Sequence, residues 1–77
     1  MTPAMTAMLQ ALPGSSREVL AEPLWKVAER AGLDVVAAHE AMGDLMLAGL
    51  AETFGPCRSA SYARTPLGDR AARGRGV

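Results

Sequence analysis

Apolar side chains recur at intervals of three and four residues through the first two thirds of the chain, which is the spacing of one face of an α-helix. The first such stripe predicts a helix over residues 2–12 and consists of Met5, Met8, Leu9 and Leu12. Thr2 is placed to cap this helix, and Pro3 suits its first position. Pro13 ends it, because proline cannot continue the hydrogen-bond ladder.

Two further helices follow the same pattern. The second is expected to start at Pro23, with a stripe of Leu24, Val27, Ala28 and Ala31. The third is expected from residue 35 to about residue 48, with a buried stripe of Ala38, Ala41, Met42, Leu45, Gly49 and Leu50. Gly32 and Gly49 are read as left-handed caps at their ends, and Asp34 as the N-cap of the third helix. Residues 17–21 fit either a brief strand or a capped turn, since Ser15 and Glu18 have capping-box spacing.

The period changes after residue 50. Residues 51–54 and 61–65 are short stretches with Thr, Phe or Tyr, and turn formers fill residues 55–60 between them. This pattern predicts a β-hairpin with a six-residue loop. Thr65 and Pro66 then resemble the start of a short helix that runs to residues 71–73. We therefore expect one domain over residues 1–73 and a disordered tail over residues 74–77.

Composition narrows the class of protein. A chain of 77 residues holds one domain at most, and its apolar runs are too short to span a membrane. Cys57 has no second cysteine for a disulfide, and His39 has no adequate set of partners for a metal. No nucleophile has a base within sequence reach. These features predict a cytoplasmic protein that is not an enzyme and holds neither a metal nor a cofactor.

Three short motifs carry a resemblance to a known type of protein. They are residues 27–34, residues 41–52 and the stretch Tyr62-Ala63-Arg64-Thr65-Pro66-Leu67-Gly68. Their order and spacing resemble the bacterial winged helix-turn-helix regulators of the multiple-antibiotic-resistance and phenolic-acid-regulator types. The resemblance implies an α+β fold in which three helices are followed by a two-stranded wing and a short C-terminal helix or tail.

In such a fold the third helix enters the DNA major groove. On this sequence the resemblance gives DNA-facing positions at Val36, Ala37, His39 and Glu40. This chain departs from the usual pattern there, because its outward positions offer aliphatic side chains, one histidine and carboxylates rather than hydrogen-bond donors. Carboxylates are repelled by nearby phosphates, although they can accept a hydrogen bond from cytosine.

The formal net charge is zero, but the charges are segregated. Residues 1–54 carry three basic and seven acidic residues, a net charge of −4, whereas residues 55–77 carry five basic residues and one acidic residue, a net charge of +4. The basic residues of the second part are Arg58, Arg64, Arg70, Arg73 and Arg75. We expect them to contact DNA phosphates. The alternatives are a solubilising tail or a surface for an acidic protein.

Met46 and Leu47 occupy positions that are usually polar in the regulators named above. Either the first helix covers them, or they form a dimer or partner interface, which a domain this small would benefit from. Met5 and Trp25 are expected to join that interface.

The sequence thus predicts a small homodimeric DNA-binding transcriptional regulator, of a size typical of phage or mobile-element proteins, with double-stranded DNA as its partner. A second hypothesis is a phage or mobile-element winged helix that binds a host protein instead, as an antirepressor or an anti-CRISPR type of inhibitor would. Its acidic third helix would then mimic or block a nucleic-acid surface.

Overall fold

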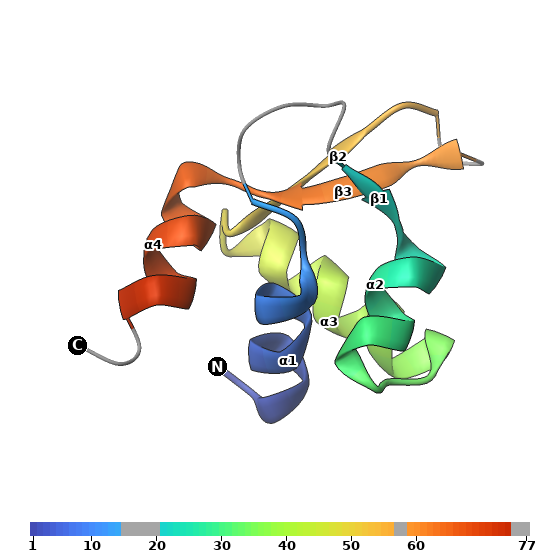
Figure 1. Cartoon of the computed structure of the whole chain (residues 1–77), viewed down its shortest axis with the longest axis horizontal. Coiled ribbons are helices and arrows are strands. Elements are labelled where there is room, and N and C mark those ends of the chain that lie inside the picture. The colour runs from blue at the N-terminus through green and yellow to red at the C-terminus, as the bar shows by residue number, and fades with distance from the viewer. Residues whose placement is uncertain (15–20, 57–58, 75–77) are drawn as a thin grey trace.

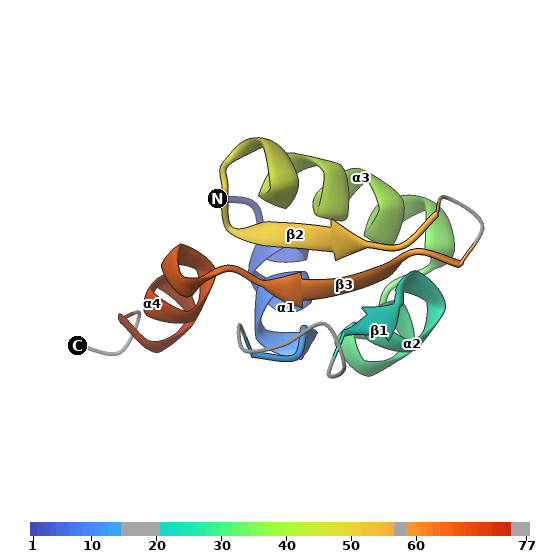
Figure 2. The same ribbon diagram turned by 90° about the horizontal axis from the view of Figure 1, so that it is seen from above.

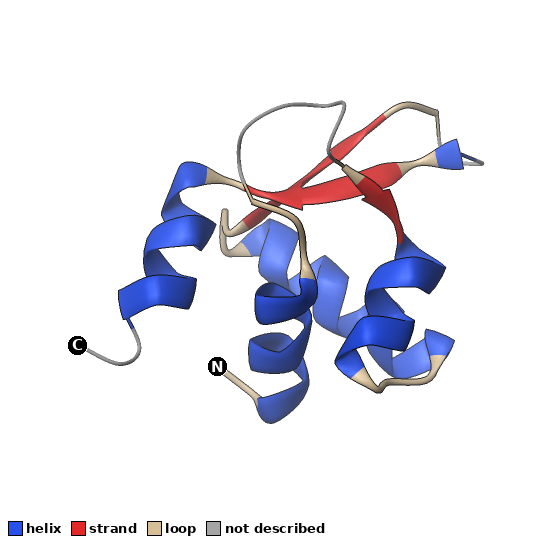
Figure 3. Cartoon of the chain, in the orientation of Figure 1, coloured by secondary structure: helices blue, strands red, loops and turns tan. Residues whose placement is uncertain are grey.

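The computed structural model describes residues 1–14, 21–56 and 59–74. In chain order the elements are α1 (Pro3–Ala11), β1 (Glu22–Pro23), α2 (Leu24–Ala31), α3 (Val35–Leu47), β2 (Ala51–Phe54), β3 (Ser61–Arg64) and α4 (Pro66–Gly74). Helices α1, α2 and α3 pack together against one face of the small sheet, and α4 lies beyond one end of it (Figure 1; Figure 3). The α+β winged-helix architecture predicted from the sequence is confirmed.

The sheet has three antiparallel strands in the order β1-β3-β2. β2 and β3 form the predicted hairpin, with Thr53 opposite Tyr62 and Phe54 opposite Ser61. β1 adds a third strand, because Glu22 pairs with Tyr62 and Pro23 with Ser61. The prediction that α2 starts at Pro23 is therefore one residue early: Pro23 ends an edge strand, where its missing N–H is tolerated, and α2 starts at Leu24. Most of the strand or turn predicted over residues 17–21 lies outside the described residues.

The predicted caps are present. Thr2 Oγ1 accepts a hydrogen bond from the Met5 amide at 3.1 Å, and Asp34 Oδ1 accepts one from the Ala37 amide at 2.8 Å. The φ angle of Gly32 is 76° and that of Gly49 is 77°, so both adopt the left-handed conformation that a side chain would disfavour. Gly49 lies one residue after the C-cap of α3, and its amide donates to the Met46 carbonyl at 3.0 Å.

The core lies between α1, α2 and α3. The stripe predicted for the third helix is buried within α3, but Gly49 is exposed and Leu50 is only partly buried, because both lie beyond the end of that helix. The buried apolar residues of the three helices and of the C-cap of α1 are Met8, Leu9, Ala11, Leu12, Val27, Ala28, Ala38, Ala41, Met42 and Leu45. Met5, Leu24 and Ala31 are partly buried and pack against this cluster. Because several members are alanines, the helix backbones can approach closely with few large side chains.

Helix α4 is fastened to the turn between α3 and β2. The Thr65 hydroxyl caps α4 by accepting from the Gly68 amide at 3.0 Å, and it donates to the Gly49 carbonyl at 2.7 Å. The Thr65 amide also donates to the Leu50 carbonyl at 3.1 Å. Of the tail predicted over residues 74–77, Gly74 is the last residue of α4, and residues 75–77 lie outside the described part of the chain. None of the described helices is long and apolar enough to cross a membrane.

Candidate functional site

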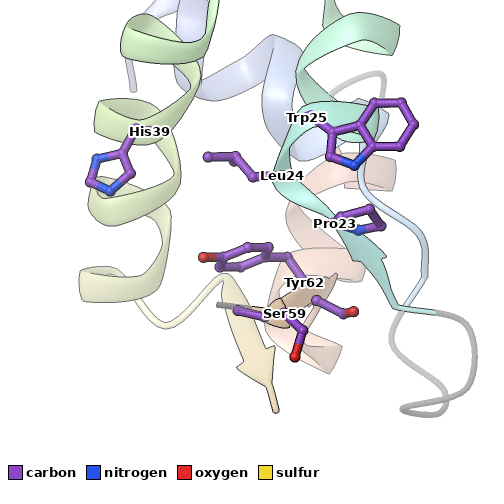
Figure 4. Close-up of a pocket in the computed structure, with 8 residues that line it drawn as sticks. Pro23, Leu24, Trp25, His39, Ser59 and Tyr62 are labelled. Carbon is purple, nitrogen blue, oxygen red and sulfur yellow. The ribbon is translucent and has the colours of Figure 1, made fainter. Parts of the chain in front are cut away.

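An open groove lies between α3 and the sheet, and we call it the α3–wing groove (Figure 4). It has a volume of about 600 Å³ and is lined by Pro23, Leu24, Trp25, His39, Ser59, Ala60, Ser61 and Tyr62. A neighbouring hollow of about 350 Å³ shares His39, Ala60 and Tyr62 with it. The two hollows therefore adjoin each other at His39, Ala60 and Tyr62.

The groove is positioned by elements that the sequence places far apart. His39 is exposed and follows the buried Ala38 on α3, which turns the imidazole away from the core. Tyr62 lies on β3, the central strand, and is partly buried against the core. Leu24 and Tyr62 extend into the space between α3 and the rest of the domain, whereas Trp25 points to the other side of α2 (Figure 4).

The described lining residues include hydrogen-bond donors and no carboxylate. The imidazole of His39 and the hydroxyls of Ser59, Ser61 and Tyr62 can all donate to an anionic oxygen. The acidic residues Glu40 and Asp44 are exposed on α3, but they do not line the groove. The three hydroxyl residues were missed by the sequence analysis. Tyr62 belongs to the motif of residues 62–68, but no sequence pattern around it indicates that β3 would lie near α3.

The other residues predicted to face DNA on α3 differ in exposure. Val36 is 71% exposed and Glu40 is also exposed, so both reach solvent. Ala37 is only partly buried by its neighbours, and its amide is used by the Asp34 cap. The outward face of α3 thus combines an aliphatic side chain, an imidazole and a carboxylate, as the sequence analysis expected.

Arg64 is engaged inside the domain. Its Nε lies 3.0 Å from Oδ1 of Asp69, and its Nη1 donates to the carbonyl oxygen of Leu9 at 3.3 Å. Only 21% of its side chain is exposed. The guanidinium of Arg64, for which a phosphate contact from the wing is predicted, thus joins β3, α4 and α1 within the domain. Alternation along the strand could not reveal this, because its partners come from distant segments.

The two arginines of α4 do not form one surface with the hairpin loop. Arg70 and Arg73 are exposed on α4, which lies at the opposite end of the molecule from the loop that joins β2 and β3 (Figure 2). The longest dimension of the molecule is 37 Å. Arg58 and Arg75 lie outside the described residues. Of the predicted basic wing and tail, the two described arginines of α4 therefore lie far from the hairpin loop.

Arg30 and Glu22 form the closest ion pair of the described residues. Two guanidinium nitrogens of Arg30 donate to the two oxygens of Glu22, at 2.7 and 2.9 Å, and Nη1 also donates to the Ala11 carbonyl at 2.6 Å. The hydrogen bonds from Arg30 lower the pKa of the Glu22 carboxyl below its ordinary value. This pair joins α2, β1 and the end of α1, so its role is structural.

The predicted interface residues fall into two groups. Leu47 is 89% exposed, Trp25 is 61% exposed and Met46 is 36% exposed. Met5, by contrast, packs against the core and contributes to the fold. One alternative for Met46 and Leu47 is that the first helix covers them. This is wrong for Leu47, because no described part of the chain covers its side chain.

The described residues contain no group of three or more His, Cys, Asp or Glu side chains that could hold a metal ion.

Comparison with solved structures gives a match over the whole domain. A crystal structure of a candidate DNA-binding protein from Ralstonia eutropha JMP134 superposes on the chain with a TM-score of 0.81. The two sequences are 25% identical, and the alignment covers 96% of this chain and 95% of that chain. No protein-family profile matches the chain, and no curated protein matches it. The resemblance to regulators of the multiple-antibiotic-resistance and phenolic-acid types therefore stays a prediction.

Proposed function

We propose that the protein binds double-stranded DNA through the α3–wing groove. The observation that carries this proposal is the lining of the groove, which includes one imidazole and three hydroxyls and to which no described residue contributes a carboxylate. The likeness to the Ralstonia protein supports it, since that protein is a candidate DNA-binding protein of the same fold.

The geometry agrees with the way a helix-turn-helix docks. The outward face of the recognition helix enters the major groove, while neighbouring segments hold the phosphate backbone. Here Val36 and His39 would meet base edges, where an aliphatic side chain can contact a thymine methyl group. Tyr62 and Ser59 would donate to phosphate oxygens beside them, and Arg58 in the hairpin loop would supply the positive charge.

The acidic side chains on α3 limit what this surface can do. Glu40 and Asp44 are exposed on the same helix and would repel phosphates, so we expect a weaker affinity than that of a recognition helix rich in arginine. A carboxylate can still accept a hydrogen bond from a cytosine amino group, which would make Glu40 a specificity element rather than an affinity element. We infer that the protein acts in cytoplasmic transcription regulation. These contacts would make its binding selective for particular DNA sequences.

The proposal is tested by fluorescence anisotropy with labelled duplexes of mixed sequence at two salt concentrations. His39→Ala and Tyr62→Phe should each weaken binding several-fold, because each removes one donor from the groove. Gln10→Ala is the matched control, since Gln10 is an exposed polar residue on α1 that does not line the groove. Binding that does not depend on salt, or a control that weakens binding as much as the groove variants, would contradict the proposal.

A second function is favoured by one observation. Leu47 is 89% exposed at the end of a helix that also exposes Glu40 and Asp44. An acidic face with an apolar end can bind a basic protein surface, as an antirepressor or an anti-CRISPR type of inhibitor would. Co-purification of a host protein, lost in Leu47→Gln and retained in His39→Ala, together with no affinity for DNA, would favour this function over DNA binding.

A further inference from the structure

One exposed stripe of α3 is acidic and ends in an apolar side chain. Glu40, Asp44 and Leu47 follow one another at intervals of four and three residues, so they lie along one side of the helix. All three are exposed, and Leu47 is 89% exposed. With a rise of about 1.5 Å per residue, the stripe is about 10 Å long.

One exposed stripe of α4 has the opposite charge and a matching apolar end. Leu67, Arg70 and Arg73 are spaced by three residues and lie on neighbouring positions of the helix surface. Leu67 is 51% exposed, and both arginines are exposed. This stripe is about 9 Å long by the same measure. In α4 the apolar residue comes first, whereas in α3 it comes last.

The reversed order makes the two stripes complementary when the helices run antiparallel. Leu47 then meets Leu67, Asp44 meets Arg70, and Glu40 meets Arg73. Helices commonly pack with residues spaced by three on one helix against residues spaced by four on the other, and the step from Glu40 to Asp44 supplies a spacing of four opposite the spacing of three in α4. The two stripes therefore match in charge, in the position of the leucine and in length. Since both belong to this chain, one copy can offer the first stripe and a second copy the other.

These stripes do not satisfy each other within one molecule. Among the described residues, Glu40, Asp44, Arg70 and Arg73 have no ion pair or side-chain hydrogen bond. We propose that the acidic stripe of α3 docks onto the basic stripe of α4 in a second copy of the chain. The contact does not require DNA binding, but it uses Glu40, so docking and DNA binding would compete for that residue. It gives the arginines of α4 a partner although they lie far from the hairpin loop.

The contact is small and is made of exposed charges around one leucine pair. Exposed ion pairs are weak and are screened by salt. The association should therefore be concentration-dependent, and its dissociation constant should rise several-fold when the salt concentration increases from 50 to about 300 mM.

The test is a charge-reversal exchange followed by analytical ultracentrifugation. The variant Glu40→Lys with Asp44→Lys, and separately the variant Arg70→Glu with Arg73→Glu, should each weaken self-association at least tenfold, because like charges then face each other. An equimolar mixture of the two variants should associate again, since each acidic stripe finds a basic one. Circular dichroism confirms that both variants are folded, and Gln10→Lys is the control for a charge added elsewhere on the surface.

Two outcomes would overturn the proposal. The first is a wild-type chain that stays monomeric up to about millimolar concentration. The second is an association that neither reversal weakens, which would place the contact on another surface such as the one near Trp25. A variant with all four reversals supplies an independent check, because it should associate with itself as the wild type does.

Discussion

Arg64 on β3 and Asp69 on α4 form an ion pair in which Nε lies 3.0 Å from Oδ1. The same guanidinium donates to the Leu9 carbonyl at 3.3 Å, and the Arg64 amide donates to the Pro13 carbonyl at 3.0 Å. One residue of the hairpin thus holds the end of α1 and the start of α4. An arginine that the sequence placed on a DNA-binding wing is a structural bridge.

Arg64→Ala should therefore lower the free energy of unfolding, by about 2 kcal/mol, because it removes a partly buried ion pair and leaves the Leu9 carbonyl without its donor. Urea denaturation measures this loss. Arg70→Ala is the control, since Arg70 is exposed on α4 and its loss should change stability by about 0.5 kcal/mol or less. Equal stabilities of the two variants would show that the bridge has no energetic role.

Gly68→Ala should destabilise the domain by roughly 1–3 kcal/mol, because a Cβ at this position would overlap the Leu50 carbonyl oxygen. Gly43→Ala is the matched substitution: Gly43 lies within α3, and a Cβ there would meet no atom within 4 Å. Alanine should stabilise that helix by about 0.5–1 kcal/mol. Thermal unfolding should thus shift in opposite directions for the two variants.

The pair formed by Glu22 and Arg30 predicts a loss of stability in acid. The pKa of Glu22 is lower in the folded state than in the unfolded state, so its contribution is present at neutral pH and is lost as the pH falls below about 4.5. Glu22→Gln should flatten the dependence of the melting temperature on pH in this range. Glu29→Gln, at an exposed residue of α2, should keep the dependence of the wild type.

Leu47 and Leu45 are two residues apart on α3 but should respond very differently to truncation. Leu45 is fully buried, so Leu45→Ala should cost about 2–5 kcal/mol of unfolding free energy. Leu47 is 89% exposed, so Leu47→Ala should change the stability of the monomer by about 0.5 kcal/mol or less. A large loss for Leu47→Ala in dilute solution would mean that another part of the chain covers this side chain.

Arg58→Ala tests the predicted phosphate contact of the hairpin loop. It should weaken binding to all DNA sequences alike and should reduce the slope of affinity against salt by about one. Arg73→Ala should leave that slope unchanged, because α4 lies at the far end of the molecule from the hairpin loop (Figure 2). If Arg73→Ala reduced the slope as well, the arginines of α4 would also contact DNA.

The sequence by itself determined the features that depend on near neighbours. Helix stripes, the caps at Thr2, Asp34 and Thr65, and the left-handed glycines follow from interactions within about four residues. The hairpin followed equally from turn formers between two short strands. Such features can be predicted from the sequence because the residues that cause them lie within one stretch of the chain.

Only the tertiary structure decided which distant residues meet. The pairing of Glu22 with Tyr62 creates the third strand, and the approach of β3 to α3 brings Tyr62 and His39 into one groove. Arg64 lies inside the domain because its partner carbonyl belongs to Leu9, a residue 55 positions away. Contacts over such separations depend on how the elements pack, and no local period in the chain encodes them.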